Sequence, residues 1–171
     1  VDTSPVVRGI YVLEKLLGYT PPPPPPDVPA IEPDIRGAVT IREQLEKHRK
    51  NATCAECHRK IDPLGFALEN FDAVGGWRDE YEKKTPIDAA GKLPSGDSFR
   101  TASEFRKLLV DREDQFTHCL TEKLMIYALG RELEIGDRPA IDKILAELNS
   151  RKAGLRDLIR LVVMSKSFLN N

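Results

Sequence analysis

Residues Cys54-Ala55-Glu56-Cys57-His58 form the stretch around which the rest of this sequence is arranged. They read C-x-x-C-H, a pattern typical of covalent attachment of c-type haem. Two thiols three positions apart lie on the same side of a helical turn, so both can add to the vinyl groups of one haem. The imidazole after the second thiol can then bind the iron, since histidine is a common proximal ligand. The motif predicts one haem c, attached through Cys54 and Cys57, with His58 on the iron.

The same two thiols also suit a zinc site or a thioredoxin-like redox pair. Zinc usually takes four ligands, and the missing ones would have to come from Cys119, His118 or His48, because the sequence has no second C-x-x-C and no H-x-x-x-H. A thioredoxin-like pair lies between a strand and a helix, whereas the sequence on both sides of Cys54 favours helix. Haem is therefore the preferred interpretation, and zinc and a redox pair stay as alternatives.

Composition narrows the class of protein. The chain has 171 residues, 40% of them hydrophobic, which suits one compact domain with an extended arm. Its 26 basic and 27 acidic side chains argue against a general nucleic-acid or membrane-surface binder, because either needs a basic excess. No apolar run approaches the ~20 residues that span a bilayer. The third cysteine, Cys119, is expected to be buried and inert, with an axial thiolate or an intermolecular disulfide as alternatives.

The haem motif also predicts where the protein works. Haem is attached to C-x-x-C-H outside the cytoplasm, so we expect an exported protein in the periplasm or an equivalent compartment. The N-terminal residues Val1-Asp2-Thr3-Ser4-Pro5 show neither the basic nor the apolar region of a signal peptide. We therefore expect the chain to be a piece of a larger exported protein, with a mature product as the alternative.

The first 39 residues predict an arm that packs on the domain. Apolar residues recur at helical spacing over 5–17, with Ser4 suited to cap the helix and Gly18 to end it. Six prolines, Pro21 to Pro26, then predict an extended polyproline II strap, with a ligand for a proline-binding partner as the alternative. We predict a helix and proline-rich strap over residues 1–39 and a haem c-binding helical domain over residues 40–171.

The haem motif is predicted to lie between a capped helix and a turn. Thr40-Ile41-Arg42-Glu43 reads as a capping box that opens a helix leading into Cys54. His48 lies on this helix among basic residues, and we expect it to face solvent. After the motif, Pro63 and Gly65 predict a turn beneath the haem, where a backbone carbonyl accepts the Nδ1–H of His58. A short helix is predicted to follow over residues 66–71.

The remainder of the chain predicts more helices and one small β element. Residues 86–99 predict either a hairpin or an irregular loop. Helices are predicted over 101–109, 113–129, 137–148 and 155–168, and the second of these is apolar nearly all round, which predicts a central position between haem and core. The predicted fold is mainly α: a cytochrome c-like helical domain with an N-terminal helix, a polyproline strap and at most one small hairpin.

Two further residues are candidates for binding the haem. Trp77 and Arg78 follow a pair of glycines. We predict that the indole N–H and the guanidinium meet the haem propionates, since arginine binds carboxylates with two parallel hydrogen bonds. Core filling is the alternative for Trp77.

Several motifs in one order resemble the C-terminal region of large exported cytochrome-like proteins of planctomycetes, which are described mostly as adjacent domains of unknown function. The likeness runs from about Ser4 to Phe168. It implies a covalent haem in an exported multidomain protein, and it carries over Cys54, Cys57 and His58 alone; it implies no reaction. The motifs are Ser4-Pro5-x-x-Arg8-Gly9, the proline run, C-x-x-C-H with Ile61 to Asp72, Gly76-Trp77-Arg78, Cys119 to Arg131, and Asp137-Arg138-Pro139.

The group that faces His58 across the iron separates the functions. A strong sixth ligand makes an electron carrier, whereas an open site permits ligand binding or peroxide chemistry. We predict Met125 as this ligand. The alternatives are an open or water-filled site, His118, Met164 and Cys119.

We therefore expect a monohaem c-type domain that transfers electrons to a redox protein or to other domains of its parent chain, rather than an enzyme. The sequence near the motif shows no convergent set of acids and bases, which favours this role. The alternative is a haem enzyme or sensor, peroxidase-like or gas-binding, with an open distal side and His118 and Glu122 as its distal pair. A third possibility is a zinc-stapled or structural interaction module.

Overall fold

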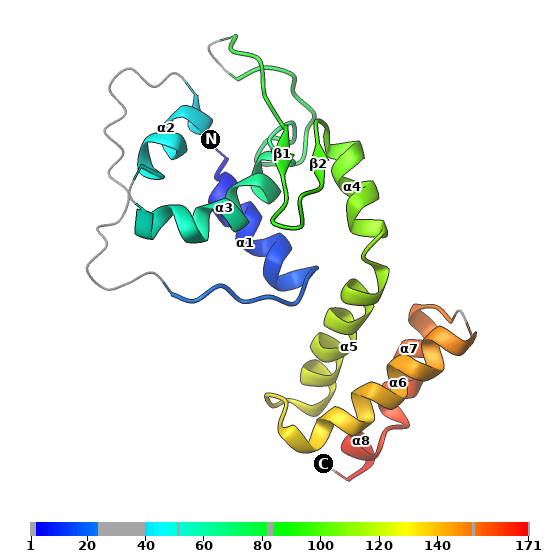
Figure 1. Cartoon of the computed structure of the whole chain (residues 1–171). Helices are drawn as coiled ribbons and strands as arrows, with labels where there is room; N and C mark the ends of the chain where they lie inside the picture. Colours follow the sequence, from blue (N-terminus) through cyan, green and yellow to red (C-terminus); the bar gives the residue numbers. More distant parts are fainter. Residues whose placement is uncertain (1–2, 24–39, 51, 82–83, 152, 171) are drawn as a thin grey trace. The chain divides into compact units, whose positions relative to one another are not determined.

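The computed structural model describes residues 3–23, 40–50, 52–81, 84–151 and 153–170 (Figure 1). The chain divides into two compact units. Unit 1 consists of Val1–Glu14 and Tyr19–Asp111, and unit 2 consists of Lys15–Gly18 and Arg112–Asn171. The described residues form eight α-helices, one short 3-10 helix and one two-stranded antiparallel sheet. The predicted fold class, mainly α with one small hairpin, is confirmed.

Two predictions fall on residues outside the described ones. Residues 24–39 include the second half of the predicted polyproline run, Pro24 to Pro26, and reach the predicted boundary between 1–39 and 40–171. Both therefore stay predictions. Within the described residues, no helix combines the length and the apolar character needed to cross a bilayer.

Threonine side chains cap the starts of two helices of unit 1. The hydroxyl of Thr40 accepts from the backbone N–H of Glu43, and the Glu43 carboxylate accepts from the N–H of Thr40, so the predicted capping box is present. Thr101 caps the next helix by accepting from the N–H of Glu104, and the Glu104 carboxylate accepts from the N–H of Arg100. The elements are α1 (Pro5–Lys15), α2 (Ile41–His48), α3 (Ala52–Phe66), β1 (Gly91–Lys92), β2 (Ser98–Phe99) and α4 (Ala102–Val110).

The predicted turn at Pro63 and Gly65 is wrong, because both residues lie inside helix α3. The helix continues through Pro63 and ends at Phe66, and residues 67–70 form turns where a short helix was predicted. A proline inside a helix removes one backbone donor and crowds the carbonyl four residues earlier, and packing against α1 offsets this cost. Gly9 and Gly65 lie at this contact, each so close to the backbone of the other helix that a Cβ would clash.

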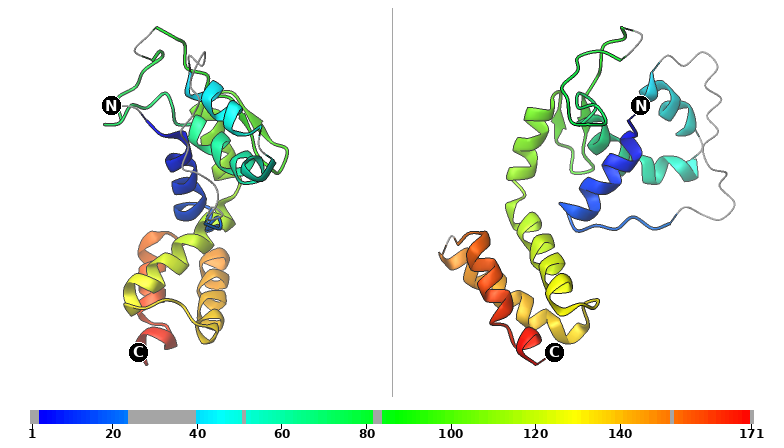
Figure 2. Two further views of the ribbon diagram at one scale, coloured as in Figure 1. Left: turned by 90° about the vertical axis from the view of Figure 1, so that its left-hand side faces the viewer. Right: turned by 180° about the vertical axis from the view of Figure 1, so that it is seen from behind.

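Unit 2 is a small helical cluster in which α5 contacts α6, α7 and α8 (Figure 1 and Figure 2). Gly130 ends α5 in the left-handed conformation, as its position in the sequence predicts. The predicted last helix is two helices, since Ser165 caps α8 directly after α7. The elements are α5 (Glu113–Leu129), η1 (Ile135–Asp137), α6 (Arg138–Arg151), α7 (Leu155–Val163) and α8 (Lys166–Leu169).

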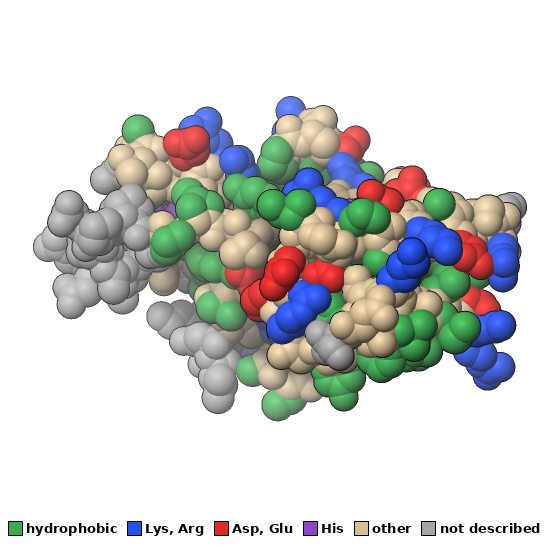
Figure 3. Space-filling model, turned by 90° about the horizontal axis from the view of Figure 1, so that it is seen from below, with side chains coloured by type: hydrophobic (Ala, Val, Ile, Leu, Met, Phe, Trp, Pro, Cys, Tyr) green, Lys and Arg blue, Asp and Glu red, His purple; other side chains and the backbone are tan. Residues whose placement is uncertain are grey.

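The core of unit 2 is almost wholly apolar and comes from α5, α6 and α7. It consists of Met125, Leu129, Ile141, Ile144, Leu148, Leu158 and Val162. The surface of the chain as a whole carries charges of both signs. Its formal net charge is −1, and acidic and basic side chains lie side by side on the face that Figure 3 shows.

Candidate functional site

The three residues of the C-x-x-C-H motif lie on one face of α3. Cys54, Cys57 and His58 occupy positions i, i+3 and i+4 of the helix, and Ile61 continues the same face at i+7. Cys54 is buried and Cys57 is half-buried, and both thiols are free of disulfides. The helix therefore presents two thiols and one imidazole on a single face, and we call the face formed by Cys54, Cys57, His58 and Ile61 the thiol stripe.

The ring of His58 is oriented by a buried carboxylate. Asp62 lies one turn further along α3, and its Oδ1 is 2.8 Å from Nδ1 of His58. A backbone carbonyl was predicted here. Because α3 does not turn at Pro63, its carbonyls stay along the helix axis, and the side chain at i+4 reaches the imidazole instead. The contact leaves Nε2 of His58 as the nitrogen that can bind a metal.

Asp62 is unusual because its carboxylate is fully buried. Its Oδ2 accepts no hydrogen bond from the described residues, and Nε of Arg49 lies 3.8 Å away. A buried carboxylate is costly unless positive charge lies close to it. An imidazole bound to iron supplies such charge at Oδ1. The free thiols, the oriented imidazole and the buried anion together fit a haem c.

His48 is the residue of this site that the sequence interpretation missed. We expected it to face solvent, but its half-buried ring lies edge-on against that of His58, with ring centroids 4.8 Å apart and planes at 72°. Burial and the charge of His58 lower the pKa of His48, whereas the charge of Asp62 acts in the opposite direction. The capping box fixes the start of α2, and His48 is its last residue. Only a few residues separate the end of α2 from Cys54, and this short connection was the sequence signal that the rings of His48 and His58 could lie close together.

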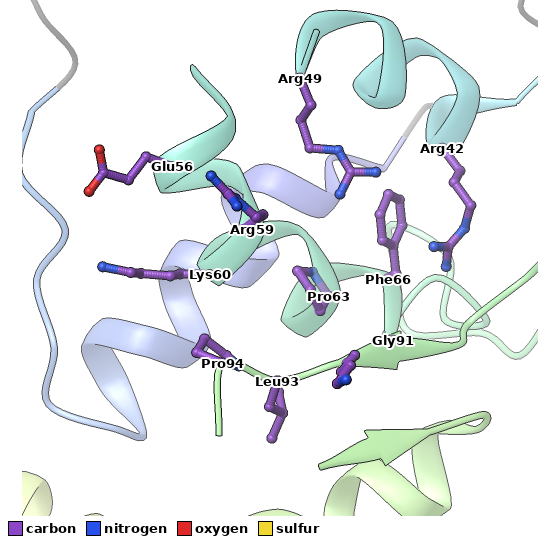
Figure 4. A pocket seen from close by; sticks show the side chains of 11 residues that line it. Arg42, Arg49, Glu56, Arg59, Lys60, Pro63, Phe66, Gly91, Leu93 and Pro94 are labelled. Carbon is purple, nitrogen blue, oxygen red and sulfur yellow. The ribbon is translucent and has the colours of Figure 1, made fainter. Parts of the chain in front are cut away.

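The opposite face of α3 lines an electropositive pocket of about 520 Å³ (Figure 4). Glu56, Arg59, Lys60 and Pro63 lie on this face, again at i, i+3, i+4 and i+7. The pocket is separate from the thiol stripe, because the two faces are about half a helical turn apart. Its remaining lining residues are Arg42, Arg49, Phe66, Gly91, Lys92, Leu93 and Pro94.

Arg42 connects the two sides of this pocket. Its guanidinium donates to the backbone carbonyls of Asp88 and Ala90 at 2.8 and 2.6 Å. It also stacks over the ring of Phe66, 4.0 Å from the ring centroid. The residue thus joins α2 to the segment before β1 and helps to hold α2 near α3.

The structure gives Trp77 and Arg78 other partners. The guanidinium of Arg78 donates to the carbonyl of Glu69 at 3.1 Å and to the hydroxyl of Thr3 at 2.6 Å. The indole N–H of Trp77 donates to Asp79 at 3.0 Å, and its ring packs edge-on against Phe71. Binding of haem propionates by Trp77 and Arg78 stays a prediction.

Arg78 belongs to a network of hydrogen bonds and ion pairs around the buried Glu69 carboxylate, which we call the Glu69 network. No sequence motif predicted it. The Glu69 carboxylate is fully buried and lies 3.3 Å from Arg8 and 3.4 Å from Arg78. It also accepts hydrogen bonds from Thr3 at 2.8 Å and Tyr81 at 3.3 Å. The network ties the start of the chain to the segment after α3, and we assign it to stability.

The predicted distal ligands all belong to unit 2. Met125 is fully buried in the core of unit 2, with its sulfur 4.0 Å from the hydroxyl of Ser165. Met164 is exposed at the end of α7. His118 lies 3.6 Å from Glu122 on the surface of α5. Iron ligation by Met125, and the alternatives, stay predictions.

Cys119 is buried, as expected from its sequence context. Burial raises the pKa of its thiol, which keeps the thiol protonated near neutral pH. Within the described residues, no group of three or more His, Cys, Asp or Glu side chains is arranged to hold a metal ion. The zinc alternative therefore finds no ligand set in this part of the chain.

Comparison with protein families divides the chain in two. Residues 1–81 match a family described as "Protein of unknown function (DUF1588)", and residues 95–168 match one described as "Protein of unknown function (DUF1585)". The chain is thus similar to two families of unknown function in two successive stretches. The DUF1588 match holds α1, α2 and α3 with the thiol stripe. The DUF1585 match begins before β2 and α4, so it includes part of unit 1 as well as the helices of unit 2. No curated protein and no solved structure matches the chain.

Proposed function

We propose that the DUF1588 region of this chain binds one haem c and transfers electrons, within a larger exported protein or to a separate redox protein. The observation that supports it best is the thiol stripe on α3, completed by an imidazole whose Nδ1 lies 2.8 Å from the buried Asp62. A bound haem c supplies one-electron redox chemistry. The exported location follows from the requirement for haem attachment and is part of the proposal.

The residues of α3 have separate tasks in this proposal. Cys54 and Cys57 hold the cofactor by two thioether bonds, and His58 binds the iron through Nε2. Asp62 keeps the proton on Nδ1 and makes the imidazole a more basic ligand. A more basic ligand and a nearby negative charge both stabilise the oxidised iron, which lowers the reduction potential.

Asp62 also supports a second candidate, a haem enzyme or sensor. An electron-rich proximal imidazole assists peroxide chemistry when the other side of the iron is open. The two candidates thus share their proximal residues and differ only in the occupant of the distal side.

Production of the chain with a haem-attachment system tests the proposal. We expect one haem per chain by the pyridine haemochrome assay, retained after denaturation because it is covalent. A Cys54→Ser/Cys57→Ser double variant should lose this covalent haem, whereas Cys119→Ala, the matched control, should keep it. A haem-free protein that carries one zinc per chain would refute both haem candidates.

Carbon monoxide separates the two candidates. The ferrous form of an electron carrier with a strong sixth ligand should bind carbon monoxide slowly or not at all. Rapid binding to the ferrous form would favour the enzyme or sensor.

A further inference from the structure

The contact between His48 and His58 joins two helices at the haem-binding face. His48 ends α2, and His58 lies in the first half of α3. The two rings meet edge-on with centroids 4.8 Å apart. Because Nδ1 of His58 is engaged by Asp62, the side of the ring that remains for a metal is the Nε2 side. The structure thus holds a second imidazole close to the ring that is expected to bind iron.

The separation of the rings is close to what one shared metal requires. A metal–imidazole nitrogen bond is about 2 Å long, and each ring centroid lies about 1.1 Å behind its nitrogen. Two imidazoles on opposite sides of one iron therefore have centroids about 6.2 Å apart. The rings, now 4.8 Å apart, would have to separate by about 1.4 Å, which is the size of the 1–2 Å helix shifts seen in conformational switching.

Unit 1 offers no other residue of this ligand type. Apart from His58, His48 is the only histidine of unit 1, and both methionines of the sequence lie in unit 2. Met125 fills the core of unit 2, and withdrawing a fully buried methionine from a core leaves a destabilising cavity. His48 is half-buried and already faces His58, so its use as a ligand requires no such loss.

We propose that His48 is the sixth ligand of the haem iron, so that α2 and α3 of unit 1 supply both axial imidazoles. This inference rests on the proposed function, since it requires a haem attached at Cys54 and Cys57. Two imidazoles close both axial positions to outside ligands, which assigns the site to electron transfer and not to peroxide chemistry. It also explains why a histidine at the end of α2 is held next to the motif.

The ferric spectrum of the haem-loaded protein tests this inference. We expect a low-spin signal by electron paramagnetic resonance and absorption for the unmodified chain. A His48→Ala variant should lose this signal in favour of a high-spin one, and added imidazole should restore the low-spin signal by filling the vacated position. His118→Ala, which removes the surface histidine of α5, is the matched control and should leave the spectrum unchanged.

A second variant guards against misfolding of His48→Ala. His48→Met keeps a side chain of similar size and should replace the second imidazole by a thioether, with a new sulfur-to-iron absorption band in the ferric form. A covalent haem whose ferric spectrum is unchanged in both variants overturns the role of His48 and leaves the proposed function intact. Absence of covalent haem in the unmodified chain overturns the proposed function itself.

Discussion

The two units of this chain are built on different interiors. Among its described residues, unit 1 buries two carboxylates completely, those of Asp62 and Glu69, and places two arginine side chains beside Glu69. Unit 2 buries an apolar cluster, and among the described residues Asp137 is its one buried carboxylate. Buried charge rarely adds net stability compared with apolar packing. The difference indicates that apolar packing dominates the interior of unit 2, whereas unit 1 also holds buried charges beside their partners.

The largest effect should follow from breaking the polar network of unit 1. Glu69→Ala leaves Arg8 and Arg78 without their shared carboxylate, and loss of one partner of a buried ion pair costs about 3–5 kcal/mol. We expect this loss in the free energy of unfolding of unit 1. Urea unfolding followed by fluorescence measures it, because Trp77 is the only tryptophan of the sequence.

Glu80→Ala is the matched control for this experiment. Glu80 is exposed and takes part in a backbone bridge with Pro86, so its side chain should contribute less than about 0.5 kcal/mol. A Glu69→Ala variant as stable as this control would show that the network does not support unit 1.

The sequence predicted the local features of both units and missed the long-range polar ones. The capping box at Thr40, the end of α5 at Gly130 and the helical face with the C-x-x-C-H motif follow from residues within a few positions of one another. Glu69 and Arg8 are 61 positions apart, so no periodic pattern relates them. Their pairing emerges only when α1 packs on α3.

The site shows the same limit at shorter range. Asp62 was placed in a predicted turn, because Pro63 and Gly65 usually end a helix, and the carboxylate was therefore not recognised as the partner of His58. The helix persists because α1 packs against it at Gly65. His48 was read as a surface residue because its neighbours in the sequence are basic. Both errors come from tertiary packing that overrides a local signal.

The core of unit 2 should respond to loss of apolar volume. Met125→Ala removes a fully buried side chain from the cluster and should lower the free energy of unfolding of unit 2 by about 2–5 kcal/mol. Far-UV circular dichroism during urea unfolding measures the change. Met164→Ala, at an exposed methionine, is the control and should change stability by less than about 0.5 kcal/mol.

The same variant also tests the sequence-based prediction that Met125 binds iron. If His48 is the ligand, the ferric spectrum of haem-loaded Met125→Ala matches that of the unmodified chain. A change to a high-spin spectrum would instead support Met125 and contradict the role of His48.

The buried carboxylate of Asp137 should make the stability of unit 2 depend on pH in the acid range. Arg131 donates to Asp137 at 2.8 and 3.2 Å and holds the pKa of that carboxyl well below its usual range. Since the pKa is lower in the folded state than in the unfolded one, the stabilisation is present above about pH 4 and is lost as the pH falls through the folded value.

Asp137→Asn should therefore lower the free energy of unfolding of unit 2 by about 1–3 kcal/mol near neutral pH, with a smaller difference below about pH 4. Unfolding measured at both pH values checks this expectation. Asp142→Asn, at an exposed position of α6, serves as the control. If the variant and the unmodified chain differ in free energy of unfolding by the same amount at both pH values, the charge of the Asp137 carboxylate does not stabilise unit 2.

The smallest predicted effect is on the stability of unit 1 at alkaline pH, and it comes from Tyr81, which donates a hydrogen bond to Glu69. Burial, with the charge and hydrogen bond of Glu69, raises the pKa of Tyr81 to about 12. The unfolded chain releases this proton near pH 10, so the folded state binds more protons between about pH 10 and 12. Unit 1 should therefore lose stability as the pH rises through this window.

Tyr81→Phe should remove this part of the alkaline loss. Because the variant lacks the hydrogen bond to Glu69, it should also lower the free energy of unfolding by about 0.5–1.5 kcal/mol near neutral pH. Trp77 fluorescence during urea unfolding at pH 8 and at pH above 10 measures both quantities. Tyr11→Phe, at an exposed tyrosine of α1, corrects for the other groups that titrate in alkali. If both variants lose stability equally above pH 10, the proton held by Tyr81 does not stabilise unit 1, and the network ends at the two arginines and Thr3.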